Sequence, residues 1–137
     1  MIGLHLVQAT IVAALKDDET LVELVGVEIR ELQWQGTEFA FPAVRVRMGI
    51  ALPTGEKCIG SHSVMPFRVV VFSEESSSLQ CDQIAAQVVE VLYLGTLTGA
   101  TFHSGLIRLS GGLGPAVWVD SLVWRAEIGF ETFIYEG

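Results

Sequence analysis

The chain has 137 residues and a formal charge of −8, because its 16 acidic residues outnumber its 8 basic ones. This length allows one domain with a real core but not two, so we expect a single domain over residues 1–137. Phosphate binding needs clustered lysine and arginine, and the net charge has the wrong sign, which argues against a nucleic-acid-binding protein. Half of the residues are hydrophobic and only 18% are charged, which suggests that other subunits cover part of the surface.

The first segment is predicted to be a helix, because its apolar residues recur at helical spacing. They share one stripe, formed by Leu4, Val7, Ile11, Ala14 and Leu15. The segment lacks a basic n-region and is too short to span a bilayer, so we expect neither a signal peptide nor a membrane protein. A short second helix is expected over 19–25, with Asp18 as its N-cap and Gly26 at its end.

Loose alternation over 27–34 predicts a first strand, and 35–41 is expected to form a loop. Pro42 then opens a second strand with two distinct faces. One face carries Val44, Val46 and Met48, and the other carries Arg45 and Arg47. This pattern is typical of a half-buried strand with a solvated or partner-facing side.

The connection over 49–63 is too long for a tight hairpin turn, and long connections in compact domains are often functional. A third strand is predicted over 65–72. Its run from Val69 to Phe72 is apolar throughout, which implies burial on both faces and a central position in the sheet.

An acidic, serine-rich turn over 73–76 is expected to lead into a helix over 78–94, which Gly95 ends. Ser77 and Gln80 have the spacing of a capping box. Acidic residues near the helix start suit the positive end of its dipole; they are Glu74, Glu75 and Asp82. The inner stripe of the helix is Ile84, Val88, Val91 and Leu92.

The remainder predicts a strand over 106–109, a glycine turn over 110–115, and one long strand or two over 117–135. These elements together predict the α+β class. We expect a mainly antiparallel sheet of four to six strands with two helices packed on one face.

No group of residues in the sequence makes a convincing catalytic or metal site. Cys58 and His62 have the spacing of half a zinc site, but Cys81 and His103 stand alone, and zinc needs four ligands. Serine, histidine and aspartate occur close together at His103-Ser104, Gly60-Ser61-His62 and Asp120-Ser121. They lack a nucleophile elbow, so hydrolysis is not expected. Two cysteines do not make a disulfide framework.

Other candidate groups also favour structural interpretations. The glycine-rich run 110–115 lacks the lysine and the following helix of a phosphate loop, so it is interpreted as a turn. Glu74 and Glu75 are interpreted as helix-start and solvated carboxylates rather than as an acid–base pair. The three tryptophans are expected in the core or at an interface; they are Trp34, Trp118 and Trp124. We therefore predict no catalytic, cofactor-binding or metal-binding residue, no cofactor and no enzyme activity.

The order of elements resembles that of the tail terminator, or tail completion, proteins of long-tailed bacteriophages. Four segments carry the resemblance: the helical opening that closes with Leu24-Val25-Gly26, the strand entered by Pro42-Ala43-Val44, the strand–turn–helix from Phe67 to Leu94, and the closing strand with Phe133-Ile134-Tyr135. Together they span nearly the whole chain.

The resemblance implies a structural protein of the virion tail or neck, made in the host cytoplasm. Members of the family form a ring, usually a hexamer, that caps the tail tube and joins the tail to the head–neck connector. The genome passes through the ring without sequence-specific binding. Six such chains would carry a formal charge of about −48, which disfavours adhesion of DNA in a channel. The connection 49–63 is the segment expected to reach a neighbouring subunit or the tube.

A small α+β enzyme or ligand-binding protein, with an apolar pocket between helices and sheet, is the alternative. Such a protein should place polar residues on the inward positions of neighbouring strands. The inward positions here are Val44, Val46, Met48, Trp124, Ala126 and Ile128, which instead predict a core. A generic oligomeric scaffold without a phage connection is a third possibility.

Overall fold

Three helices and eight strands make up the part of the chain that the computed structural model describes, namely residues 3–33, 40–49, 52–53, 62–75, 77–113, 117–120 and 123–136. The helices are α1 (Leu4–Lys16), α2 (Glu19–Val25) and α3 (Leu79–Leu92). The strands are β1 (Ile29–Glu31), β2 (Ala43–Met48), β3 (Leu52–Pro53), β4 (His62–Ser73), β5 (Phe102–Ser104), β6 (Arg108–Leu113), β7 (Val117–Asp120) and β8 (Val123–Glu136).

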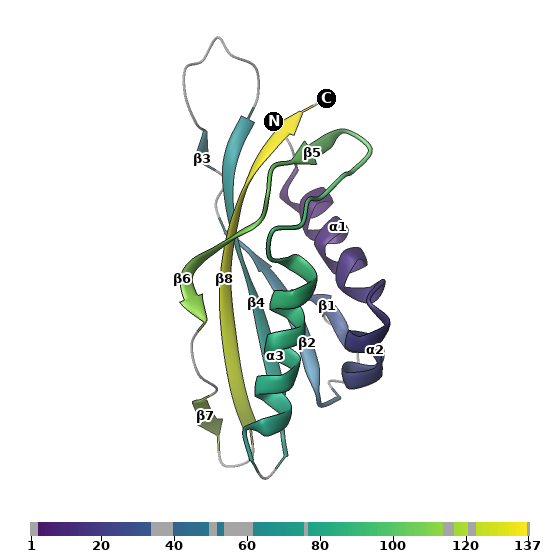
Figure 1. The fold of residues 1–137 in the computed structure, drawn as a ribbon, viewed down its shortest axis with the longest axis vertical. Helices are drawn as coiled ribbons and strands as arrows, with labels where there is room; N and C mark the ends of the chain where they lie inside the picture. The colour runs from purple at the N-terminus through teal and green to yellow at the C-terminus, as the bar shows by residue number, and fades with distance from the viewer. Residues whose placement is uncertain are drawn as a thin grey trace.

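The strands form one sheet in the order β1-β2-β4-β8-β5, with β3 paired to β4 and both β6 and β7 paired to β8. The pair β1–β2 is parallel and the other pairs are antiparallel. The three helices lie on one side of this sheet (Figure 1). The α+β class and the mainly antiparallel sheet are thereby confirmed, with one parallel pair that makes the sheet mixed. The short α2 completes the layer formed by the two longer helices.

Local signals explain where α1 and α2 begin and end. The stripe predicted for the first helix is buried, with Val7, Ile11 and Leu15 fully shielded from solvent. The Asp18 carboxylate accepts a hydrogen bond from the Leu21 amide at 2.9 Å and so caps α2. Gly26 ends α2 with φ +77°, a conformation in which a side chain would be strained.

The start of α3 corrects the predicted capping box. Gln80 does not reach back to the helix start, because its side-chain oxygen accepts a hydrogen bond at 2.6 Å from the Ser73 hydroxyl at the end of β4. The Ser77 hydroxyl accepts from the Leu79 amide at 3.4 Å, and the N-cap residue Ser78 makes no side-chain capping bond. The polar turn thus ties the strand to the helix.

Several strand boundaries also differ from the predicted ones. Strand β4 begins at His62 because it pairs with β8 along its whole length, from His62↔Tyr135 to Ser73↔Trp124. The expected glycine turn is wrong over Ser110–Leu113, which continues β6 along β8 through a register shift. The short strand β5 was not predicted, and the region 117–135 forms two strands, β7 and β8.

The core lies between the helices and the inner face of the sheet. Alternate residues of the central strands reach it, and Phe67 of β4 stacks on Phe130 of β8 with ring centroids 5.2 Å apart. The inward positions predicted as core are confirmed: Val44, Val46, Ala126 and Ile128 are buried, and Met48 and Trp124 pack against them partly exposed. No helix of the described residues is long and apolar enough to cross a membrane.

The stacked pair gives a direct test of this core. Phe130→Ala is expected to lower the free energy of unfolding by about 3–5 kcal/mol, because it removes a fully buried ring and leaves a cavity. Phe133→Ala is the matched control, since Phe133 lies three residues later on the same strand and is 39% exposed. Urea unfolding measures both. Equal losses would contradict the assignment of the two faces of β8.

Candidate interaction surface

The two zinc-binding candidates whose side chains the structure describes, Cys81 and His103, lie apart. His103 stacks on Tyr135 with centroids 5.2 Å apart, on the β5–β8 edge, whereas Cys81 lies in the first turn of α3 and is buried. Cys58 lies outside the described residues, as does the side chain of His62. Among the residues that the structure describes, no three histidine, cysteine or acidic side chains are placed to hold a metal ion.

The hydroxyl considered for hydrolysis has a structural role. The Ser104 Oγ accepts a hydrogen bond from the Leu97 amide at 2.7 Å and donates to the Gly105 carbonyl at 2.8 Å. These bonds join the connection after α3 to β5 and leave the hydroxyl buried. Asp120 lies in β7, described by its backbone alone, and residues 60, 61 and 121 fall outside the description.

The remaining candidates agree with their structural interpretations where the structure describes them. Glu74 and Glu75 are exposed, and the Glu75 amide donates to the Ser73 hydroxyl at 3.4 Å. Trp124 packs against the core. Trp34 and the side chain of Trp118 lie outside the description.

Cys81 is an inert core thiol. Burial raises the pKa of Cys81 to about 11, with a smaller contribution in the same direction from the charge of Asp82. Its Sγ lies 3.6 Å from the Val71 carbonyl, to which the thiol donates. A protonated and buried thiol is a poor nucleophile.

This thiol should react only when the protein opens. In a Cys58→Ser background, a disulfide reagent at pH 8 is expected to label Cys81 slowly in the native state and rapidly in urea, and rapid native labelling would contradict its burial.

The contribution of the Cys81 thiol to the free energy of unfolding should depend on pH. This contribution is complete below pH 9 and falls as pH rises towards 11, because the pKa of Cys81 in the folded protein exceeds the ordinary value of 9.0. Cys81→Ala should remove that part of the pH dependence.

The outer face of the sheet, opposite the helices, carries every arginine of the chain. Alternation and register place them there: Arg30 on β1, Arg45 and Arg47 on β2, Arg68 on β4, Arg108 on β6 and Arg125 on β8. Three glutamates share this face, namely Glu28, Glu127 and Glu131. We call these nine residues the arginine face. The sequence indicated it only through Arg45 and Arg47, because the other arginines lie on strands far apart in the chain.

One ion pair on this face is buried. Arg45 is 2% exposed, which contradicts its expected place on a solvated face, whereas Arg47 is exposed as expected. The Arg45 guanidinium donates to the Glu28 carboxylate at 2.7 Å, and also to the backbone carbonyls of Glu28 at 2.9 Å and Val44 at 3.0 Å. These bonds fix the residue before β1 against β2 and leave the pair unavailable to a partner.

A second, exposed network lies further along the face. The Glu127 carboxylate forms ion pairs with the guanidinium groups of Arg68 at 3.0 Å and Arg125 at 3.1 Å. The Arg68 side chain is 61% exposed, and Arg47 and Arg108 are exposed as well. These three cationic groups can meet carboxylates from another molecule.

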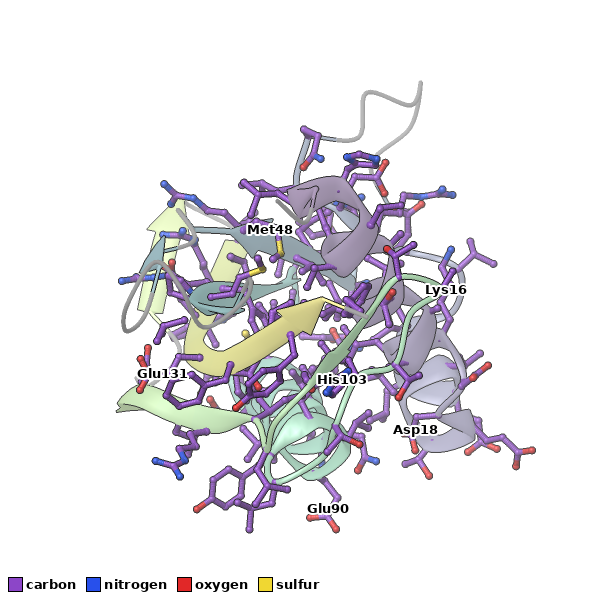
Figure 2. The ribbon with its side chains drawn as sticks, turned by 90° about the horizontal axis from the view of Figure 1, so that it is seen from above. Lys16, Asp18, Met48, Glu90, His103 and Glu131 are labelled. Carbon is purple, nitrogen blue, oxygen red and sulfur yellow. The ribbon has the colours of Figure 1, made fainter. Side chains whose placement is uncertain are left out.

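The helical side has the opposite charge. The acidic residues on and next to its helices are Asp17, Asp18, Glu19 and Glu23 at the α1–α2 corner and Asp82 and Glu90 on α3, and Lys16 is the only lysine or arginine of the three helices. We call this set the acidic helical layer. Figure 2 shows Asp18 and Glu90 with the helices and Glu131 on the far side with the strands. The arginine face and the acidic helical layer therefore differ by eight formal charges, since six arginines outnumber three glutamates in one set and six acids outnumber one lysine in the other.

The two networks should respond differently to mutation. Glu28→Ala is expected to lower the free energy of unfolding by about 3–5 kcal/mol, because it leaves the buried Arg45 guanidinium without its counter-charge. Glu127→Ala, the matched control, should cost less than about 1 kcal/mol, because its partners remain hydrated. Urea unfolding distinguishes them; a Glu28 variant as stable as the control would show that the pair contributes little.

Comparisons with known proteins extend over nearly the whole fold. A chain from a structure described as the virion of a native gene transfer agent (GTA) particle matches with a TM-score of 0.83 and 20% sequence identity, over 97% of this chain and 96% of that chain. A second solved structure matches with a TM-score of 0.59 and 14% identity, over 96% of each chain. No protein-family model and no curated protein sequence matches. At these identities the likeness shows a shared fold.

Proposed function

We propose that the chain is a structural virion protein without enzyme activity. The observation that carries this proposal is the fold likeness, at a TM-score of 0.83 over 97% of the chain, to a chain of a gene transfer agent virion. The placement of the candidate catalytic residues is consistent with it. Where described, they pack, cap or bond to backbone instead of converging on a common point.

Within the virion, we propose the role of tail terminator. In this role the chain forms a homo-oligomeric ring, of six copies by resemblance to that family, which caps the tail tube and joins the tail to the head–neck connector. Its partners are the tube protein and neck proteins. The excess of acidic residues supports passage of genomic DNA without sequence-specific binding. The connection 49–63, most of which lies outside the described residues, stays the predicted contact with a neighbour or the tube.

The alternative, an enzyme or ligand-binding protein, finds less support in the geometry. Buried side chains from all three helices and the central strands fill the space where its apolar pocket would lie. A groove of about 340 Å³ instead opens beside α1 and β1. Its central polar residue, Gln8, exchanges two hydrogen bonds with Gln33 at 2.7 and 3.0 Å and donates to the Val46 carbonyl at 2.8 Å. The side-chain amide of Gln8 is therefore already hydrogen-bonded to other residues of the chain.

The proposed role predicts a specific position in a particle. Antibodies raised against the purified chain should place gold label at the head end of the tail in particles from cells that carry the gene. Label on the capsid or at the tail tip would contradict the terminator role while leaving a virion role intact. Particles without label, shown by mass spectrometry to lack the chain, would contradict both.

A further inference from the structure

The outer side of the sheet is a whole face to which the described elements contribute no covering layer. All three helices pack against the inner side (Figure 1). The outer side presents exposed cationic groups from three strands, and also Phe133, which is 39% exposed. Arginine and aromatic side chains are enriched in protein interfaces relative to the rest of the surface.

Charge decides which surface fits this face. If two copies met through the same face, arginine would oppose arginine in the self-complementary contact, and like charges across an interface cost several kcal/mol. The acidic helical layer of another copy has the complementary sign. It also offers apolar side chains among its carboxylates, with Leu79 62% exposed and Val22 37% exposed.

We propose that the arginine face of one copy binds the acidic helical layer of a second copy, head to tail. This inference rests on the proposed ring and names the surfaces that build it. A contact between unlike faces is heterologous, so each copy keeps one free face of each kind for the next copy. Repeated contacts of this kind form a closed ring when a whole number of equal rotations between neighbouring copies adds up to a full turn.

The contact can be tested with two charge-reversed variants. One carries Arg47→Glu and Arg108→Glu on the arginine face, at exposed positions that lie outside the Glu28 and Glu127 ion pairs. The other carries Glu19→Lys, Glu23→Lys and Glu90→Lys on exposed positions of the acidic helical layer, which changes the formal charge of that layer from −5 to +1. Each alone should raise the protein concentration at half assembly by on the order of tenfold or more, because every contact then opposes like charges.

An equimolar mixture of the two variants should restore assembly. Each reversed arginine face then meets a reversed helical layer, and the native pairs of faces also remain, so the two variants alternate. Sedimentation equilibrium and native mass spectrometry measure this, and circular dichroism checks that each variant is folded. A mixture that assembles no better than its components would overturn the proposal, as would a wild-type chain that stays monomeric at its highest soluble concentration.

Lys16→Glu is the matched control for net charge. It makes the chain more negative, as the arginine-face variant does, but it strengthens the charge of the acidic helical layer. The proposal predicts unchanged or tighter assembly, whereas general repulsion between acidic chains predicts weaker assembly. Weaker assembly for this variant would therefore contradict the proposed contact.

Binding of nucleic acid by the arginine face is the competing outcome. Fluorescence anisotropy with duplex DNA should show no loss of affinity in the arginine-face variant relative to wild type. A loss of DNA binding together with unchanged assembly would overturn the proposal in favour of a DNA surface. The gold-labelling result is independent of both measurements, so a terminator that assembles through other faces would still be recognised.

Discussion

The pairing of β4 with β8 is the constraint on which the rest of the structure depends. It extends through all twelve residues of β4 without a shift of register, and a slip of one residue would exchange the faces of every side chain. The correct register places Phe67 and Phe130 together under the helices and Arg68 and Glu127 together on the outside. One ladder therefore sets both the core and the charged surface.

Much of the fold could be predicted because its signals are local. Helical spacing in α1, the cap at Asp18, the terminating Gly26 and the apolar run in β4 are each contained in a few neighbouring residues. The predictions from sequence were wrong where pairing with residues distant in the chain determines the local structure. The run Ser110–Leu113 is glycine-rich and resembles a turn, but β8 supplies hydrogen bonds that keep it extended. Gly129 contributes, because a Cβ there would come within 2.5 Å of the Ser110 carbonyl.

The charged surface was largely hidden from sequence reasoning for the same reason. Arg45 and Arg47 could be assigned to one side of a strand by alternation, but their companions come from four other strands between positions 30 and 125. The net charge of −8 does not indicate this surface either, because it is a sum over two sides of opposite charge. The burial of Arg45 depends on Glu28, whose position follows from the parallel pairing of β1 with β2.

The short strands at both edges of the described sheet limit how copies can associate. One edge is β1, three residues long, and the other is divided among β5, β6 and β7, so neither presents a long row of free backbone hydrogen-bonding groups. Copies are thereby discouraged from fusing their sheets into one continuous ribbon. In the proposed ring, each copy would then be added or removed singly, so that a misplaced copy could leave before the ring closes.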